Sequence, residues 1–496
     1  MSNYFYDMLP AEEMAQLSYI PTVSEFIEWI EKKYSDRPAI SDMVVTYTYS
    51  EMCKRIARRR AFLGTLGLAK GDKVAIFERN SIDAVEMFLA VTSAGYVAIN
   101  FPSALPEPAV IGSCMKFDVK VLFAREEFMP LCTKAGVKVL PSASIADNTA
   151  PAAELSKEDD AAIFFTGGTT GTPKGVVLSH GALMRGSFNG IFMPGSVLSP
   201  HRYVGLLPLS HVFGLVRGMM SVFYTGAEFF TAEDMKATIG MLPRIKPTCL
   251  VLVPGLCEIL LGLVKMYGPQ FLGGELKTVI GGAANVPPRM IAEFDKLGIS
   301  LLEGYGMTEG ANLSSGNSDI KTKPDSVGKL YPGQEGKIVD GELWIKGDNL
   351  MKEYYKDPEA TKAAITEDGW LKTGDLARFD EEGYLYIVGR IKNLIILSNG
   401  ENVSPESLEE PFYKNPCVKD CLVKEDDIDG RPVIAIEILP QMPAFEGKSW
   451  EDIVAFMNKL VGDVNKTLPT YQQIAKVTVR KEDFKRTGSL KVSRNQ

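Results

Sequence analysis

A loop rich in glycine and threonine constrains this chain more than any other feature. Residues 166–175 read TGGTTGTPKG. Glycine lets the backbone take a positive φ and turn its N–H groups toward one point, while threonine hydroxyls add donors and Lys174 adds a positive charge. The loop follows an apolar segment at 161–165, and we expect a helix at 179–189 after it. This context predicts an α/β fold with a site for a polyphosphate anion.

The loop is not the P-loop of nucleotide triphosphatases. That motif needs a glycine directly before its lysine and a hydroxyl residue directly after it. Here Pro173 precedes Lys174 and Gly175 follows it. The segment instead resembles the Y-T-S-G-T-T-G-x-P-K-G signature of the adenylate-forming superfamily, which includes acyl-CoA synthetases, adenylation domains of peptide synthetases and firefly-type luciferases. The resemblance implies phosphate binding by Thr166, Gly167 (where many members have serine), Gly168, Thr169, Thr170, Gly171, Thr172 and Lys174.

Composition excludes several other kinds of site. The formal net charge is −8, so no basic surface indicates binding to nucleic acid. Seven scattered cysteines and three histidines lack the spacing of a disulfide framework or a zinc site. The first residues show no signal-peptide pattern, and the longest apolar run, 249–264, is interrupted by proline, glycine and glutamate. We therefore expect a cytoplasmic protein with no transmembrane segment.

The 496 residues are too many for one hydrophobic core, so more than one domain is expected. Helix and strand patterns alternate through the first hundred residues, and apolar strands at 250–254, 278–281 and 300–304 end in loops rich in glycine or proline. Sites in such sheets lie at these strand ends. We expect an α/β protein with a large N-terminal α/β domain at 1–389, a hinge at 390–392 and a small mobile α+β domain at 393–496.

Two further motifs carry groups that suit a nucleotide. The small side chains of GGAA at 281–284 let a flat ring approach the backbone. In YGMTE at 305–309, Thr308 offers a hydroxyl to an α-phosphate and Glu309 offers a carboxylate to Mg²⁺, which prefers oxygen ligands. Similar motifs occur in this order in the superfamily, which implies adenine or phosphate contacts by Gly282, Ala283, Ala284, Tyr305, Gly306, Met307 and Thr308.

The C-terminal third contributes charged residues. Asp375 can accept hydrogen bonds from both ribose hydroxyls, and Arg390 brings a cation to the same nucleotide. The tail KRTGSLK at 485–491 resembles the closing pattern of the superfamily and makes Lys491 the catalytic lysine, although Leu490 stands where glycine is usual. Its charge would offset the repulsion between a carboxylate and the α-phosphate of ATP. The resemblance also implies a hinge at Lys392 and a thiol channel lined by the segment around Gly400.

The segment LSHVFG at 209–214 resembles the gate beside the acyl pocket. His211 is expected to act as a wall and gate rather than as a general base, because its neighbours are apolar. The apolar residues near it favour a fatty or aryl acid; they are Val212, Phe213, Leu215, Met219 and Met220. Arg217 faces either a second carboxylate or solvent.

The sequence thus predicts a carboxylate–CoA ligase that uses ATP, Mg²⁺ and CoA. A small carboxylic acid and ATP would give acyl-AMP and pyrophosphate, with Lys174, His211, Thr308, Glu309 and Lys491 as catalytic residues, and CoA would then displace AMP. An enzyme that loads the phosphopantetheine of an acyl carrier protein, a luciferase-like monooxygenase and a non-catalytic nucleotide-binding protein remain alternatives. Amino acids are disfavoured as substrates because 208–215 contains no acid to pair with an ammonium group.

Overall fold

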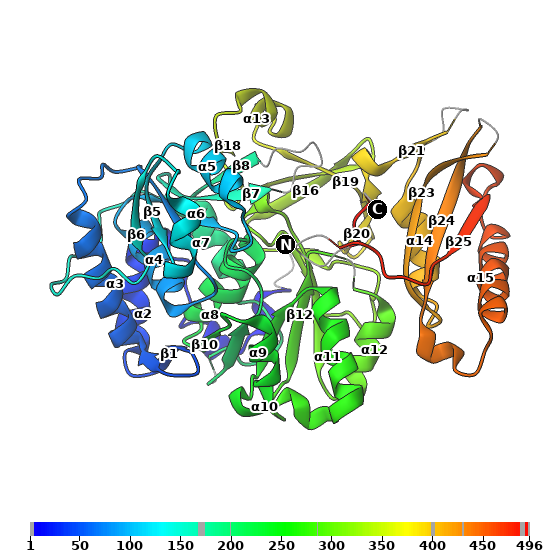
Figure 1. Cartoon of the computed structure of the whole chain (residues 1–496), viewed down its shortest axis with the longest axis horizontal. Helices are drawn as coiled ribbons and strands as arrows, with labels where there is room; N and C mark the ends of the chain where they lie inside the picture. The colour runs from blue at the N-terminus through cyan, green and yellow to red at the C-terminus, as the bar shows by residue number, and fades with distance from the viewer. Residues whose placement is uncertain are drawn as a thin grey trace.

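The computed structural model describes residues 4–166, 174–198, 200–284, 286–397, 402–428, 431–486 and 492–494. A large unit holds the N-terminal and middle parts of the chain, and a smaller unit holds the C-terminal part (Figure 1). The fold class predicted from the sequence, a large α/β unit followed by a smaller one, is confirmed. The exact boundaries at 389 and 393 stay a prediction.

A seven-stranded sheet in the described residues carries the phosphate loop. Its order is β18-β8-β7-β4-β3-β5-β6, and β4, β3, β5 and β6 run parallel. The strands are β3 (Lys73–Phe77), β4 (Val97–Phe101), β5 (Val119–Ala124), β6 (Lys138–Pro141), β7 (Asp160–Thr166), β8 (Lys174–Ser179) and β18 (Glu353–Tyr354). β7 and β8 are antiparallel, with Thr166 opposite Lys174. The helix expected at 179–189 is confirmed as α7 (His180–Asn189), and β8, which the sequence analysis did not predict, lies between the loop and that helix.

A second sheet, nine-stranded in the described residues, has the order β15-β14-β13-β12-β11-β9-β10-β1-β2. Its strands are β1 (Pro38–Ser41), β2 (Thr46–Thr48), β9 (Arg202–Gly205), β10 (Glu228–Thr231), β11 (Cys249–Leu252), β12 (Thr278–Gly282), β13 (Ser300–Tyr305), β14 (Ser315–Asn317) and β15 (Lys329–Leu330). The central strands are parallel, so the loops after β12 and β13 leave the same edge of the sheet.

Helices pack against both sheets of the large unit. They are α1 (Ala11–Met14), α2 (Val23–Tyr34), α3 (Tyr49–Gly64), α4 (Ile82–Ser93), α5 (Glu107–Lys116), α6 (Met129–Cys132), α7 (His180–Asn189), α8 (Ser221–Tyr224), α9 (Met235–Gly240), α10 (Leu242–Ile245), α11 (Pro254–Tyr267), α12 (Pro288–Lys296) and α13 (Pro358–Ala364). Caps fix several starts: Thr48 and Glu51 form a capping box on α3, and Ser179 accepts a hydrogen bond from Ala182 on α7. α4 is buried along nearly its whole length and shares one core with α2, α3 and α7.

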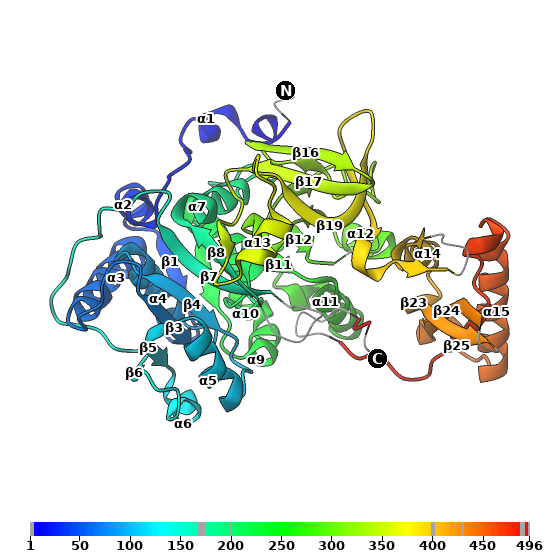
Figure 2. The same ribbon diagram turned by 90° about the horizontal axis from the view of Figure 1, so that it is seen from above.

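A third, antiparallel sheet closes the large unit next to the second one. Its order is β16-β17-β19-β20, formed by β16 (Gln334–Val339), β17 (Glu342–Gly347), β19 (Leu371–Phe379) and β20 (Leu385–Arg390). Asp375 and Arg390 are cross-strand partners on β19 and β20. β20 is also the last strand before the chain enters the smaller unit (Figure 1). Figure 2 shows β16, β17 and β19 in the large unit, with α15 of the smaller unit at the far right.

The smaller unit has its own apolar core. It contains β21 (Ile395–Ile396), β22 (Asn402–Val403), α14 (Pro405–Tyr413), β23 (Val418–Ile428), β24 (Arg431–Pro440), α15 (Trp450–Asn465) and β25 (Lys476–Val479). Leu408 of α14, Met457 of α15 and Ile436 of β24 are buried in the same apolar core. Lys414 reaches back to the large unit through an ion pair with Asp325 at 3.2 Å. The described residues of the unit form their own core, and the polar contacts that join them to the larger unit include this ion pair, a hydrogen bond from Ser404 Oγ to the carbonyl of Val388 and one from Arg289 to the carbonyl of Lys419.

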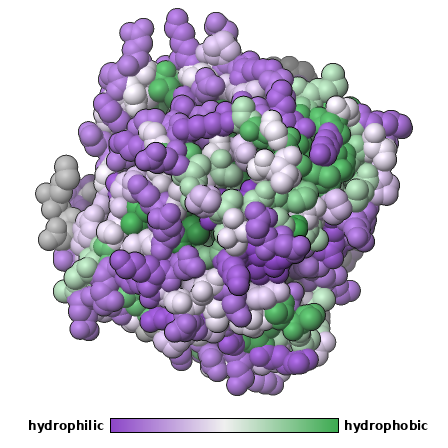
Figure 3. All heavy atoms as spheres, turned by 90° about the vertical axis from the view of Figure 1, so that its left-hand side faces the viewer, coloured by the Kyte–Doolittle hydropathy of each residue, from purple (hydrophilic) through white to green (hydrophobic). Residues whose placement is uncertain are grey.

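The polarity of one face, the state of the cysteines and the apolar content of the helices agree with the composition. The face over α3 and β6 is mostly hydrophilic, with separate small apolar patches (Figure 3). All seven cysteines fall in the described residues and are free. Within those residues, no helix combines the length and apolar content needed to cross a bilayer.

Candidate active site

Tyr354 brings Lys174 and Glu309 together. Lys174 opens β8, and Tyr354 lies on the neighbouring strand β18, paired with Val176. The Lys174 Nζ lies 4.5 Å from the centre of the Tyr354 ring, and the Tyr354 hydroxyl donates a hydrogen bond of 2.8 Å to Glu309 Oε1. Burial and the nearby Glu309 raise the pKa of Tyr354, so the hydroxyl remains a donor. The two ends of this contact are a cation for phosphate and a carboxylate for a metal ion.

Residues 167–173 of the phosphate loop, which include Gly167, Gly168, Thr169, Thr170, Gly171 and Thr172, lie outside the described residues. Thr166 and Lys174 flank them as opposite residues of the β7–β8 pair. The loop therefore connects two antiparallel strands, and both of its ends are fixed beside Tyr354 and Glu309.

Asp375 joins Tyr305 to Arg390. The Tyr305 hydroxyl donates to Asp375 Oδ2 at 2.6 Å, and Arg390 Nε lies 2.7 Å from Asp375 Oδ1. Asp375 is only 1% exposed, and its burial raises the pKa of the carboxyl while Arg390 and Tyr305 oppose that rise. Its two oxygens thus contact protein groups here, and the predicted bonds to ribose hydroxyls stay a prediction.

The loops after β12 and β13 meet at a flat, tightly packed surface. Gly282 and Gly304 are opposite each other in the parallel pair, and a methyl group on Gly282 would lie 2.9 Å from the Phe213 ring. A side chain on Gly306 would overlap the carbonyl oxygen of Asn312. Ala283 has a φ of +64°, so this turn places a non-glycine residue in the left-handed region. These close contacts are with protein atoms, and the adenine and phosphate contacts expected of 282–284 and 305–308 stay a prediction.

Met351 and Asn349 fix the backbone of the Thr308–Gly310 turn by hydrogen bonds. The amide of Met351 donates to the carbonyl oxygen of Glu309 at 2.7 Å, and the buried Asn349 Nδ2 donates to the carbonyl of Gly310. Ala311 and Asn312 then follow with positive φ. Backbone strain of this kind persists where the surroundings fix it, which suits a loop that must present Thr308 and Glu309.

The gate segment leads into a π-helix. His211 is exposed, and its carbonyl accepts a hydrogen bond of 2.9 Å from Leu215. The π-helix η3 runs over Phe213–Met220. π-helical turns are rare and occur frequently at functional sites. The apolar residues named in the sequence, Leu215, Met219 and Met220, are buried on it, and Arg217 is 3% exposed. The alternative that Arg217 faces solvent was therefore wrong.

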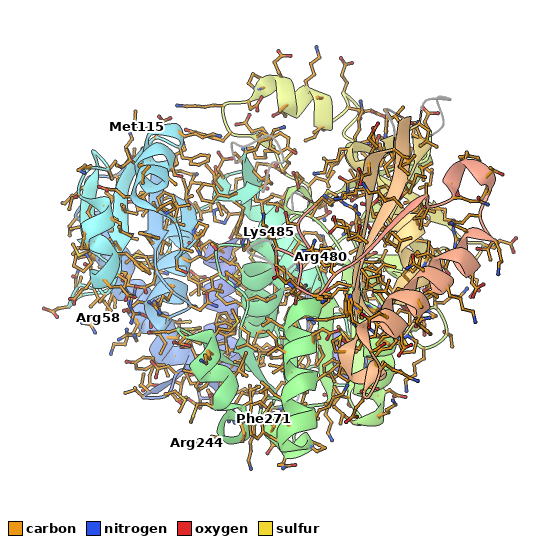
Figure 4. All side chains as sticks on the ribbon, turned by 45° about the vertical axis from the view of Figure 1, so that its right-hand side comes forward. Arg58, Met115, Arg244, Phe271, Arg480 and Lys485 are labelled. Carbon is orange, nitrogen blue, oxygen red and sulfur yellow. The ribbon has the colours of Figure 1, made fainter. Side chains whose placement is uncertain are left out.

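The tail that carries Lys491 is anchored on both sides. Lys491 and Gly400 lie outside the described residues. Before Lys491, Arg486 pairs with Asp420, and Arg486 and Val492 form a β-bridge; after it, Arg494 bonds to both carboxylate oxygens of Glu409 at 3.1 and 3.0 Å. Figure 4 shows Arg480 and Lys485 on the segment that runs from β25 toward the large unit. The loop around Lys491 is therefore pinned to the smaller unit at both ends.

Lys392, the predicted hinge, lies close enough to Asp375 and Glu309 to interact with both carboxylates through its charge. Its pKa is lowered by partial burial and by Arg390, while Asp375 and Glu309 act in the opposite direction. The side chain therefore senses both acidic residues. Its role as a hinge stays a prediction.

Sequence reasoning missed Tyr354 of the site and a buried acid, Glu303, in the strand that leads to it. Tyr354 carried no signal, because a tyrosine in a short polar stretch reads as an ordinary surface residue. Glu303 lies one residue before Gly304, and burial raises the pKa of its carboxyl to about 8. The amide of Val286 donates a hydrogen bond of 3.0 Å to this carboxyl, which acts to lower the pKa. An acid inside an apolar strand pattern was the signal that could have revealed it.

The described residues contain no cluster of three or more histidine, cysteine, aspartate or glutamate side chains able to hold a metal ion. Mg²⁺ does not need one, since it is commonly bound by one or two carboxylates together with substrate phosphates. Glu309 fits this pattern, because it is partly exposed and Tyr354 occupies one of its oxygens.

Family models and named relatives match both the large and the small unit of the chain. The family model for AMP-binding enzymes matches residues 27–355, and the model for the C-terminal domain of AMP-binding enzymes matches residues 392–496. The 4-coumarate–CoA ligase-like 6 protein of Arabidopsis thaliana is 31% identical over 406 residues, which cover 72% of this chain and 70% of the relative. The long-chain-fatty-acid–CoA ligase of Bacillus subtilis (strain 168) is 28% identical over 474 residues, which cover 82% and 83%.

A solved structure confirms the fold. The anthranilate CoA ligase AuaEII in complex with anthranoyl-AMP is similar with a TM-score of 0.84 at 20% identity, covering 96% of each chain. The chain therefore belongs to the family of AMP-binding enzymes, the adenylate-forming superfamily whose signature the loop at 166–175 resembles.

Proposed function

We propose that the protein is an AMP-forming carboxylate–CoA ligase. The observation that carries the proposal is the contact of Tyr354 with both Lys174 and Glu309, which joins a phosphate-binding cation to a metal-binding carboxylate beside the Tyr305–Asp375–Arg390 cluster. Relatives named as CoA ligases across plants and bacteria support CoA as the acceptor.

In the first half-reaction a carboxylate oxygen attacks the α-phosphorus of ATP. The bond from that phosphorus to the bridging oxygen breaks, and pyrophosphate leaves with the electron pair. Lys174 and Thr166 would hold the β- and γ-phosphates, Thr308 the α-phosphate, and Lys491 the reacting oxygens. Glu309 would hold Mg²⁺, which supplies charge neutralisation for the leaving pyrophosphate.

In the second half-reaction the thiol of CoA attacks the acyl carbon. The bond between acyl carbon and phosphate oxygen breaks, AMP leaves, and the thiol proton passes to solvent. We propose that the unit at 393–496 rotates about Lys392 between the two steps, which would withdraw Lys491 and bring the Gly400 segment to the thiol. The separate apolar core of the smaller unit supports such a motion.

The test is ATP–pyrophosphate exchange across a panel of carboxylic acids, followed by CoA and mass detection of thioesters. Exchange that depends on the acid, together with an acyl-CoA product, is expected. Exchange without an acyl-CoA product, and with transfer to a phosphopantetheine-bearing carrier protein, would contradict the choice of acceptor. Nucleotide binding without exchange for any acid would contradict the proposal as a whole.

A further inference from the structure

Arg217 is a buried cation without an acidic partner. It lies on η3, is 3% exposed, and no carboxylate in the described part of the chain forms an ion pair or a hydrogen bond with it. Charged side chains are almost never fully buried unless they are paired. An unpaired guanidinium in the interior is therefore costly, and its retention calls for an anion that the described residues do not supply.

The surroundings of Arg217 contain hydroxyl and thiol groups but no acid. Burial raises the pKa of Tyr203, and Arg217 opposes this rise through a hydrogen bond and its charge. Burial likewise raises the pKa of Cys249 and Tyr331, to about 11 and about 12, and Arg217 lowers both. Burial thus keeps these three groups neutral, and the charge of Arg217 stays uncompensated.

A second buried polar group lies on the helix against which Arg217 packs. Gly190 directly follows α7, and a methyl group there would lie 2.9 Å from Cδ of Arg217, so the glycine permits the close approach. The preceding residue, Asn189, is completely buried, and neither its amide nitrogen nor its amide oxygen has a hydrogen-bond partner. A buried amide without partners costs about 1–3 kcal/mol.

The loop after Glu309 adds further unpartnered atoms. Gly186, one turn before Asn189 on α7, faces the carbonyl of Ala311. In the same loop the Nδ2 of Asn312 and the Oγ of Ser314 are buried and lack partners. Three elements, α7, η3 and the 311–314 loop, therefore converge with a cation and several unused hydrogen-bonding groups.

This polar cluster lies behind the gate. Phe213, at the start of η3, packs against Gly282 beside the predicted nucleotide, and Arg217 follows four residues later on the same helix. Residues four apart share a helix face and are separated by at most about 6 Å along the axis. An acid whose reacting carboxylate lies at Gly282 would extend toward Arg217.

We propose that Arg217 and Asn189 form a subsite for an anionic group at the far end of the acid, so that the substrates are dicarboxylic acids. The inference rests on the proposed function and names its substrate class. The second carboxylate would accept hydrogen bonds from the guanidinium of Arg217 and the amide of Asn189. The apolar residues on η3, such as Leu215 and Met219, would contact the chain between the two carboxylates.

The experiment compares dicarboxylic acids with monocarboxylic acids of equal chain length, from short to long, by kcat/KM in ATP–pyrophosphate exchange. The wild-type protein, Arg217→Met, Asn189→Leu and Arg185→Met are measured. Arg185 is the matched control, because it lies on α7 like Asn189 but stacks on Tyr19 at 3.8 Å and pairs with Asp348. Methionine removes the charge in both arginine variants and keeps much of the side-chain length.

We expect the wild-type protein to prefer a diacid by about 10² or more, because a site built around a substrate group rejects the analogue that lacks it. Arg217→Met should lower this diacid-to-monoacid ratio by about 10²-fold and Asn189→Leu by about tenfold, while Arg185→Met leaves it unchanged.

A wild-type protein that prefers monoacids at every length would overturn the inference, and that result does not depend on the folding of any variant. A diacid-to-monoacid ratio that Arg217→Met leaves unchanged would also overturn the inference. An inorganic anion bound permanently to Arg217 would give that result. Both results would leave the proposed function intact, since exchange with monoacids would still occur. No exchange with any acid would instead refute the proposed function and this inference together.

Discussion

Replacing Tyr354 with phenylalanine tests the contact on which the proposed function rests. The change removes the hydroxyl that donates to Glu309 Oε1 at 2.8 Å and keeps the ring 4.5 Å from Lys174 Nζ. A hydrogen bond to a charged group contributes about 1.5–3 kcal/mol. We therefore expect kcat/KM for ATP–pyrophosphate exchange to fall about ten- to a hundredfold, with a higher Mg²⁺ requirement.

Tyr354→Leu removes the ring as well and should reduce exchange further. A cation–π contact contributes about 0.5–2 kcal/mol, so the additional loss is about two- to thirtyfold. Tyr355→Phe is the matched control, because the neighbouring hydroxyl donates to Asp118 rather than to a site residue. That variant should keep wild-type exchange.

A double-mutant cycle decides whether Tyr354 acts through Glu309. Exchange is measured against Mg²⁺ for Tyr354→Phe, Glu309→Gln and the double variant, with thermal unfolding as a check on folding. If the hydroxyl acts by holding the carboxylate, the double variant should be no worse than Glu309→Gln alone. Fully additive losses in folded proteins would refute the reasoning, because they would mean that the two side chains act independently.

Three further outcomes are expected. Burial raises the pKa of Glu303 to about 8, so the wild type should lose stability relative to Glu303→Gln as pH rises from about 5 to 8, by about 1.4 kcal/mol per pH unit; parallel urea-unfolding profiles would contradict this. Lys491→Ala should lower adenylation about 10²- to 10³-fold and spare thioester formation from supplied acyl-AMP, whereas Lys485→Ala in the same tail should change neither; equal loss of both half-reactions would be evidence against the assignment. Lys392→Pro fixes φ near −65° and should abolish one half-reaction while keeping the other; parallel loss in a folded protein would exclude a hinge there.

The sequence predicted the regular elements well where the patterns were long. The helix expected at 179–189 is α7, and the strands expected at 278–281 and 300–304 are β12 and β13, because compact apolar runs that end at glycine leave few alternatives. The strand β8 was missed, since its apolar residues directly precede the cap of α7 and a short apolar run does not distinguish strand from helix. The error changes the context of the phosphate loop from a strand–helix junction to a β-hairpin.

The candidate site was predictable only where a motif carried it. Motifs located Lys174, Glu309, Asp375 and Arg390, and the structure brings them into two clusters. Tyr354 joins the first cluster through strand pairing between residues far apart in the chain, and no local pattern reports such a pairing. The burial of Asp375 likewise depends on the sheet β16-β17-β19-β20 packing against the Tyr305 loop.

Arg217 was visible in the sequence, but only the structure decided its environment. A single charged residue in the otherwise apolar run after the gate was visible in the sequence, and its position four residues after Phe213 places it on the gate's face of the helix. The sequence could not decide between solvent and a second carboxylate, because burial depends on the packing of η3 against α7 and the second sheet. The structure removes the solvent alternative and leaves a cation beside the unpartnered amide of Asn189. Buried charges require partners, and no carboxylate in the described residues pairs with Arg217. In an enzyme that activates acids, the second carboxylate that we propose for the substrate would supply that partner.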